Sequence, residues 1–114
     1  MRNDIYHKLQ EVARTKCLIG YDELNTELQL GLDLSLSSDR NLLGQWLGEI
    51  SDNEAKQGRH MLSSLVVHKK GDYFGYPGKG YFEFARELGV HTGEDDVRFW
   101  AKEVKWLHQY WSEH

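Results

Sequence analysis

The stretch HKKGDYFGYPGKGYF (residues 68–82) decides how the chain is expected to fold. It holds the chain's only proline, and Lys70-Gly71-Asp72 has the composition of a hairpin tip. The segment before it, Met61 to Val67, has the apolar and β-branched content of a buried strand. Tyr73 to Tyr76 would return as the partner strand, ended by Pro77-Gly78. The sequence therefore predicts a β-hairpin at this point of the chain.

Three helices are predicted before the hairpin, because apolar residues recur at helical spacing. The first, capped by Asn3 or Asp4, has an apolar side that consists of Ile5, Leu9, Val12 and Ala13. An extended step from Lys16 to Tyr21 leads to a short second helix, capped by Asp22 and stopped by Gly31. The third is capped by Ser38, and its apolar side consists of Leu42, Leu43, Trp46, Leu47 and Ile50.

The opposite side of the third helix is unusual because it carries two glycines, Gly44 and Gly48. Each glycine inside a helix costs about 1 kcal/mol relative to alanine. That cost is understandable if another backbone or a ligand approaches this side closely. The alternative interpretation is that the two glycines are neutral substitutions without functional consequence.

The segments that follow the apolar part of the third helix complete the predicted fold. Ser51 and Glu54 match a capping box, which predicts a further helical turn to Gln57. A short helix is predicted from Tyr81 to Leu88, and a last helix begins with Thr92 and Asp95. Three helices followed by a hairpin are the element order of a winged helix-turn-helix. We therefore expect an α+β fold: one winged-helix-like domain over residues 1–114, with residues 68–76 as the wing and an added aromatic-rich C-terminal helix.

Composition narrows the class of protein. The chain has 114 residues, a net charge of −4, 39% hydrophobic residues and one cysteine. A single cysteine forms no internal disulfide, and no apolar run is long enough to span a bilayer. We expect a cytoplasmic protein without a membrane partner. The negative net charge disfavours nucleic-acid binding by bulk electrostatics, although a local basic patch is compatible with it.

Basic and polar residues suggest where nucleic acid would bind. Lysines interleaved with aromatic residues in the predicted wing suit phosphate contact and base stacking. Asparagine and glutamine on the third helix are side chains that read base edges. The predicted nucleic-acid-binding residues are Arg40, Asn41, Gly44, Gln45, Gly48, His68, Lys69, Lys70 and Lys79. A solvated helix face and a solvated hairpin are the alternatives.

The last helix offers a second candidate surface. Its aromatic residues form two adjacent stripes that together are wider than the apolar face of an ordinary surface helix. The predicted partner interface consists of Trp100, Trp106, Tyr110 and Trp111. Packing of this helix on two sides within its own domain is the alternative, and self-association is a third use of the same surface.

Catalytic and cofactor motifs are not found. Gly78-Lys79-Gly80 precedes a helix but lacks the remainder of a phosphate-binding loop or a dinucleotide fingerprint. The six histidines show no zinc-ligand spacing, and Cys17 has no recognisable base partner. We therefore predict no catalytic residue, no metal and no cofactor.

A family pattern is found in three stretches within residues 15–80: CLIGYDELNTEL, NLLGQWLGEIS and LSSLVVHKKGDYFGY. These stretches resemble the winged-helix domain of alkyltransferase-like DNA repair proteins. The resemblance implies DNA binding, but Ser63 or Ser64 stands where the reactive cysteine of that family would fall, so alkyl transfer is not implied. The pattern LSSLVVHKKGD followed by PGKGYF is also similar to one in small bacterial proteins of unassigned role.

Two functional hypotheses follow. The first is a non-catalytic, DNA-binding winged-helix protein that contacts nucleic acid through the third helix and the wing. The second is a protein-interaction module, such as an inhibitor, antitoxin or immunity-type protein, that uses an acidic and aromatic surface. Recovery of a protein partner after nuclease treatment would distinguish the second from the first.

Overall fold

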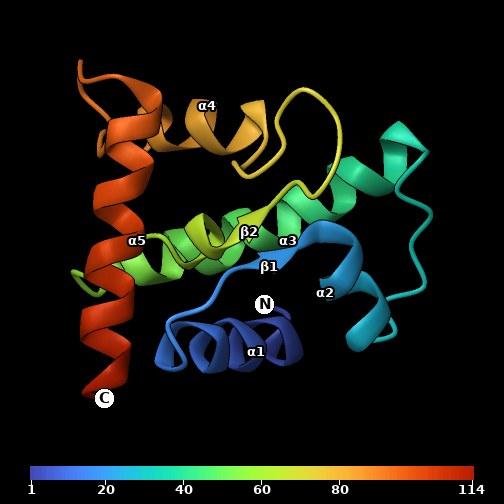
Figure 1. The fold of residues 1–114 in the computed structure, drawn as a ribbon, viewed down its shortest axis with the longest axis horizontal. Helices are drawn as coiled ribbons and strands as arrows, with labels where there is room; N and C mark the ends of the chain where they lie inside the picture. The colour runs from blue at the N-terminus through green and yellow to red at the C-terminus, as the bar shows by residue number, and fades with distance from the viewer.

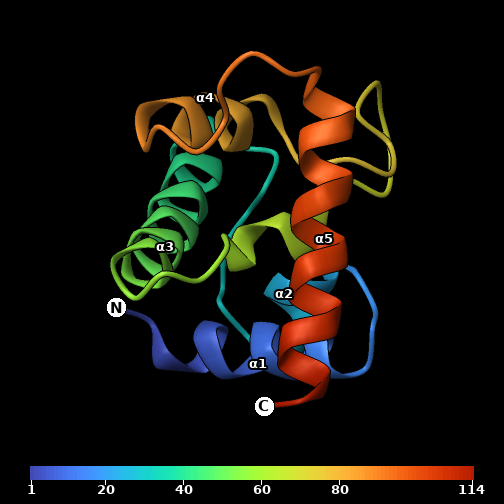
Figure 2. The same ribbon diagram turned by 90° about the vertical axis from the view of Figure 1, so that its left-hand side faces the viewer.

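The computed structural model describes all residues, 1–114, as an α+β fold of five α-helices and a small sheet (Figure 1). The elements in chain order are α1 (Asn3–Arg14), β1 (Ile19–Gly20), α2 (Tyr21–Glu27), α3 (Ser37–Lys56), the 3-10 helix η1 (Leu62–Leu65), β2 (Val66–Val67), α4 (Lys79–Glu87) and α5 (Asp96–Ser112). Figure 2 shows α5 running along one face of the molecule, from the level of α4 to that of α1.

The main core lies where α1, α3 and α5 surround η1. The predicted stripe of α1 is confirmed, since Ile5, Leu9, Val12 and Ala13 are all buried. Leu43, Leu47 and Ile50 of α3 are buried as predicted, whereas Leu42 is exposed. A second, smaller cluster holds α4 against α5 and consists of Met61, Tyr81, Phe82, Ala85 and Phe99.

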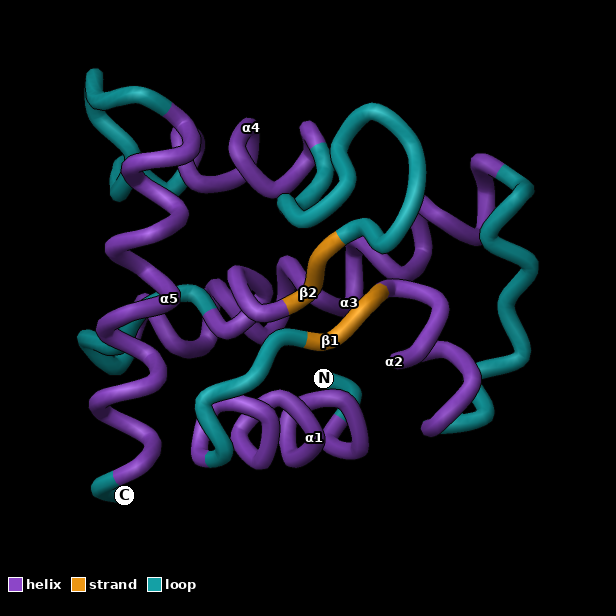
Figure 3. Tube along the Cα trace, viewed as in Figure 1, coloured by secondary structure: helices purple, strands orange, loops and turns teal.

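The two strands form a parallel pair in the middle of the fold (Figure 3). Ile19 lies opposite Val66, and Gly20 lies opposite Val67. This pairing joins segments that are far apart in the sequence, and it places the start of α2 beside the chain that leaves β2. The sheet thereby fixes one wall of the site described below.

The predicted β-hairpin is not formed, so the prediction of a hairpin wing is wrong. β2 pairs with β1 and not with residues 73–76, which form a loop that closes on His68. The His68 N–H donates to the Tyr76 carbonyl at 2.9 Å, and the Gly75 N–H donates to the His68 carbonyl at 2.7 Å. Gly71 and Gly75 both have positive φ angles, which allow the sharp turns of this loop.

The segment Met61 to Val67 is buried as predicted, but only its last two residues form a strand. Leu62 to Leu65 form η1 because this segment is enclosed by helices on several sides. A strand places alternate side chains on two faces, whereas a helical turn distributes side chains around its axis. The helical turn is therefore the conformation that fills this space.

The predicted helix starts differ from the observed ones by a few residues. The N-cap residues of α1, α2 and α3 are Arg2, Gly20 and Leu36, and none of them makes a side-chain cap. Asp95 does cap α5, since its carboxylate accepts from the Arg98 N–H at 3.0 Å.

The capping box predicted at Ser51 and Glu54 is wrong, because both residues lie inside α3 and are buried. Ser51 Oγ is 2.7 Å from Ser63 Oγ, and Glu54 pairs with Arg59. Because both polar side chains have partners, they can be buried inside α3. The helix continues past them to Lys56. None of the helices combines the length and apolar character needed to cross a membrane.

Candidate functional site

A cleft of about 590 Å³ lies between α3, α4 and the loop of residues 68–78. Figure 1 shows this loop between α4 and the first turns of α3. Eight of the nine predicted nucleic-acid-binding residues line the cleft: Arg40, Asn41, Gly44, Gly48, His68, Lys69, Lys70 and Lys79. The ninth, Gln45, is exposed on α3 but does not line it.

The floor of the cleft is the glycine-bearing side of α3. A Cβ at Gly44 would meet no atom within 4 Å, so the space above this residue is open. A Cβ at Gly48 would lie 3.6 Å from the Phe84 ring of α4. The glycine side is therefore free at one position and covered by the next helix at the other.

One wall of the cleft depends on contacts between two segments that are far apart in the sequence, one at Tyr21 and the other at Gly78. The Gly78 N–H, at the N-cap of α4, donates to the Tyr21 hydroxyl at 3.1 Å. A Cβ at Gly78 would lie only 2.9 Å from Nε2 of His68, so a larger residue at position 78 would displace the imidazole. The Tyr21 side chain thus holds the start of α4 beside β1.

His68 faces the cleft from the end of β2. Its ring packs on Tyr21, with centroids 4.6 Å apart, and lies 6.0 Å from the ring of Tyr73. Burial lowers the pKa of His68 below its ordinary value of 6.5, and the charge of Asp22 partly opposes that effect. The His68 imidazole lines the cleft without a hydrogen bond to the rest of the chain, and its Nε2 lies against Gly78.

The three lysines of the cleft pair with carboxylates. The closest N–O distances are 3.7 Å for Lys69 with Glu23, 3.5 Å for Lys70 with Asp22 and 3.8 Å for Lys79 with Glu83. All six side chains are more than half exposed, and ion pairs of this kind contribute about 0–1 kcal/mol. A phosphate group could therefore replace a carboxylate at little cost.

Charges of both signs line the cleft. Arg40, Lys69, Lys70 and Lys79 are cationic, and Asp22, Glu83 and Glu87 are anionic. Four positive and three negative charges leave an excess of one positive charge with His68 neutral. The Arg40 guanidinium also donates to the carbonyls of Leu34 and Ser35, both at 3.0 Å, which fixes it at the start of α3. The cationic groups are therefore local and positioned, and the cleft is not a strongly basic surface.

The loop beside the cleft exposes three aromatic side chains. Tyr73, Phe74 and Tyr76 are 46%, 62% and 39% exposed. Tyr76 packs edge-on against Trp100 of α5, at 5.4 Å between ring centroids, whereas Tyr73 lies next to His68. Large apolar side chains that protrude from a loop are available to stack on a flat ligand.

Ser63 and Ser64, the serines that the predicted resemblance places at a reactive cysteine, are hydrogen-bonded within the protein. Ser63 pairs with Ser51, and Ser64 Oγ is 2.6 Å from the Tyr81 hydroxyl. His60 pairs instead with the buried carboxylate of Glu103 and stacks on Trp106. No histidine activates either serine. No three His, Cys, Asp or Glu side chains converge to hold a metal ion.

The aromatic residues of α5 are largely used within the chain. Trp111 is buried, and the Trp100 indole N–H donates to the Ser64 carbonyl at 2.8 Å. Trp106 stacks on Tyr110 at 4.7 Å between ring centroids. These contacts account for the width of the aromatic face, because α5 packs on more than one neighbour.

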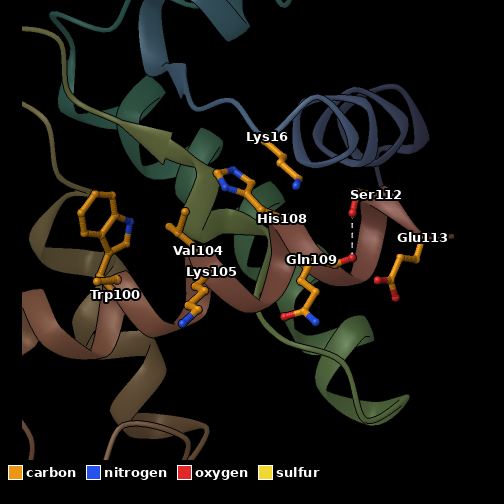
Figure 4. A pocket seen from close by; sticks show the side chains of 9 residues that line it. Lys16, Trp100, Val104, Lys105, His108, Gln109, Ser112 and Glu113 are labelled. Atoms are coloured by element: carbon orange, nitrogen blue, oxygen red, sulfur yellow. Dashed lines mark hydrogen bonds between the residues drawn. The ribbon is translucent and has the colours of Figure 1, made fainter.

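A second hollow, of about 680 Å³, follows the outer side of α5 (Figure 4). Its lining residues are Lys16, Trp100, Ala101, Val104, Lys105, His108, Gln109, Ser112 and Glu113. Of the four residues predicted as a partner interface, only Trp100 lines it. Two lysines and one glutamate make this surface basic and not acidic.

Several cleft residues were not predicted from the sequence. Glu83 and Glu87 follow Lys79 at intervals of four residues, so helical spacing could have placed them on the same side. Tyr21 and Phe84 carry no such signal, because their roles depend on contacts with Gly78 and Gly48 from distant segments.

No family model, curated protein or solved structure matches the chain. The resemblance to alkyltransferase-like proteins stays a prediction, and a functional conclusion rests on the cleft itself.

Proposed function

We propose that this is a non-catalytic nucleic-acid-binding protein whose ligand occupies the cleft between α3, α4 and the loop of residues 68–78. One observation carries the proposal: predicted nucleic-acid-binding residues from three segments, the third helix, the basic segment and the start of α4, line the same cleft. Such convergence supplies cationic, amide and imidazole groups within the reach of one ligand.

Phosphate groups would be held mainly by Lys69, Lys70 and Lys79. Each lysine would exchange an exposed carboxylate partner for phosphate. The start of α4 faces the cleft through Gly78, Lys79 and Gly80, and the helix dipole favours negative charge there. Asn41 and the neutral His68 would provide hydrogen bonds to sugar or base.

The proposed binding mode keeps part of the winged-helix prediction. Three helices precede a basic, aromatic segment, as in that fold class. The segment is a loop that closes on His68, so it would meet nucleic acid as a loop flanking a cleft and not as a β-ribbon laid in a groove.

Fluorescence anisotropy with labelled oligonucleotides tests the proposal. Affinity should fall steeply between about 50 mM and about 200 mM salt, because phosphate contacts release counterions. Replacement of Lys70 and Lys79 by glutamine should weaken binding and flatten the salt dependence. Lys105→Gln on the outer side of α5 removes one positive charge away from the cleft and serves as the control for each of the single replacements, Lys70→Gln and Lys79→Gln. Absence of binding to any oligonucleotide at low salt would contradict the proposal.

A protein-interaction role is the second candidate, favoured by the hollow along α5. Trp100 and Val104 line this hollow with Lys16 and Lys105 beside them. A partner there would present an acidic, partly apolar surface. Pull-down after nuclease treatment separates the candidates: a stoichiometric protein lost on Trp100→Ala but retained on Lys79→Gln supports this second role.

A further inference from the structure

We infer that the cleft takes a single strand, with one nucleotide seated over Gly44 and a neighbouring base stacked on Tyr73, and that it does not take a duplex. This inference rests on the proposed function and specifies its ligand. Three features of the cleft lead to it: the cover over α3, the size of the open space and the position of the exposed aromatic residues.

Because α4 covers part of α3, this helix cannot enter the major groove of a duplex as a recognition helix does. A helix that reads double-stranded DNA must protrude far enough to enter the major groove. The glycine side of α3 is instead the floor of a cleft, and Phe84 of α4 lies over Gly48. α4 and the loop of residues 68–78 would meet the sugar-phosphate backbones before α3 reached a base pair.

The open space is of the size that a nucleotide needs. Its volume of about 590 Å³ lies within the range of small-ligand sites, which is about 300–1,000 Å³. No atom lies within 4 Å of the Cβ positions at Gly44 or Gly80, so floor and wall both leave room. A flexible strand can direct one nucleotide into such a space, whereas a paired strand cannot.

Polar groups without a partner face that space. Asn41 and His68 line the cleft, and neither side chain makes a hydrogen bond within the chain. Tyr73 is 46% exposed and lies outside the cleft lining, 6.0 Å from the ring of His68, which lines the cleft; we therefore assign the neighbouring base to Tyr73. Stacking on aromatic side chains is a common, sequence-tolerant way to hold unpaired bases.

Fluorescence anisotropy at low salt, with a fluorescein-labelled oligo(dT) of about 12 nucleotides and a duplex of the same length, tests the inference. Wild-type protein should bind the single strand about tenfold more tightly than the duplex. Gly44→Leu fills the open floor and should weaken single-strand binding about tenfold. Gln45→Leu, one residue along α3 but outside the cleft, should bind as wild type does. Circular dichroism establishes that both variants are folded.

Equal or tighter binding of the duplex would overturn the inference and leave the proposed nucleic-acid function standing. Equal effects of Gly44→Leu and Gln45→Leu on folded protein would also overturn it. Failure of both probes to bind would instead contradict the proposed function itself. As an independent check, Tyr73→Ala should weaken single-strand binding, whereas Tyr76→Ala should not, because Tyr76 packs against Trp100.

Discussion

Gly48 of α3 faces the ring of Phe84 in α4, and a Cβ at position 48 would lie 3.6 Å from that ring. One turn earlier, Gly44 faces open space. The two glycines lie one turn apart on the same side of α3, but their surroundings differ. At position 48 a methyl group would be in ordinary contact with Phe84 and only a larger side chain would crowd α4, whereas Gly44 leaves the cleft floor empty.

This difference predicts opposite responses to the same substitution. Gly44→Leu should keep or raise the free energy of unfolding, because leucine is a better helix former by about 0.8–1 kcal/mol. Gly48→Leu should be less stable than Gly44→Leu by about 2 kcal/mol, because its side chain overlaps Phe84. Urea denaturation of the two variants measures the difference, and equal stabilities would contradict the packing of α4 on α3.

Removal of cleft carboxylates should strengthen nucleic-acid binding. Asp22 and Glu83 pair with Lys70 and Lys79, so they compete with phosphate for the same ammonium groups. Asp22→Asn with Glu83→Gln should raise affinity about tenfold at low salt. Glu94→Gln removes one carboxylate that pairs with Lys102, outside the cleft, and should have little effect. Weaker binding by the double variant would show that the lysines do not contact phosphate.

Binding should also depend on the protonation of His68. In the free protein, burial lowers the pKa of His68 below 6.5, so its contribution to stability is present above that pH and is lost as the pH falls. A phosphate beside the ring would favour the charged form. The charged groups Asp22, Lys69 and Lys70 line the cleft beside this ring.

Affinity for an oligonucleotide is therefore expected to rise as the pH falls from about 8 to about 6. The rise should vanish in His68→Gln, which keeps a polar side chain but does not titrate. Anisotropy titrations at several pH values measure the effect. An unchanged pH profile in the variant would place the ligand away from this ring.

The buried pair of Glu54 and Arg59 should be important for stability. Glu54 is fully buried and accepts from Arg59 Nη2 at 2.7 Å, from Arg59 Nε at 3.1 Å and from the Tyr6 hydroxyl at 3.2 Å. Glu54→Gln leaves the guanidinium without a charged partner and should cost roughly 3 kcal/mol. Glu49→Gln, at an exposed position of the same helix, should change stability by less than about 0.5 kcal/mol. Thermal or urea unfolding compares them.

The junction of α4 and α5 should respond to acid. Asp96 accepts from the buried His91 ring at 2.7 Å and pairs with Arg86. The hydrogen bond from His91 is the largest cause that lowers the pKa of Asp96 below 3.8, and Arg86 adds to it. Because the folded-state pKa is depressed, the stabilisation is present above about 3.8 and is lost as the pH falls further.

Asp96→Asn should accordingly lower the melting temperature at neutral pH. The difference from wild type should shrink as the pH falls below about 3.8 toward the lowered pKa of folded Asp96, because protonation then removes the charge of the wild-type side chain. Asp72→Asn, in an exposed loop, should leave the melting temperature at neutral pH unchanged. A difference for Asp96→Asn that stays constant with pH would show that the charge is not responsible.

Much of the helical structure was predictable from local pattern. The apolar spacing of Ile5, Leu9 and Val12 determines one face of α1 whatever surrounds it. The predicted end of the helix at Leu88 is close to the observed end of α4, where Gly89 follows with a positive φ angle that glycine adopts readily. The candidate site was also visible in part, because lysines, glycines and aromatic residues gather in residues 68–82.

Tertiary structure decided the rest. A short apolar run such as Met61 to Val67 is compatible with a strand or with a buried helical turn, and the enclosing helices selected the turn. The strand β2 pairs with β1 and leaves residues 68–76 as a loop, since pairing of distant segments leaves no local signal.

The sequence by itself determined the helices and the groups available to a ligand, because periodicity and residue type are local properties. Only the tertiary structure decided that Gly44 lies open while Gly48 lies under Phe84, and that Tyr21 anchors the start of α4. The physical reason is that a cleft is made of contacts between segments that are distant in the chain, and such contacts are fixed by the packing of the whole molecule.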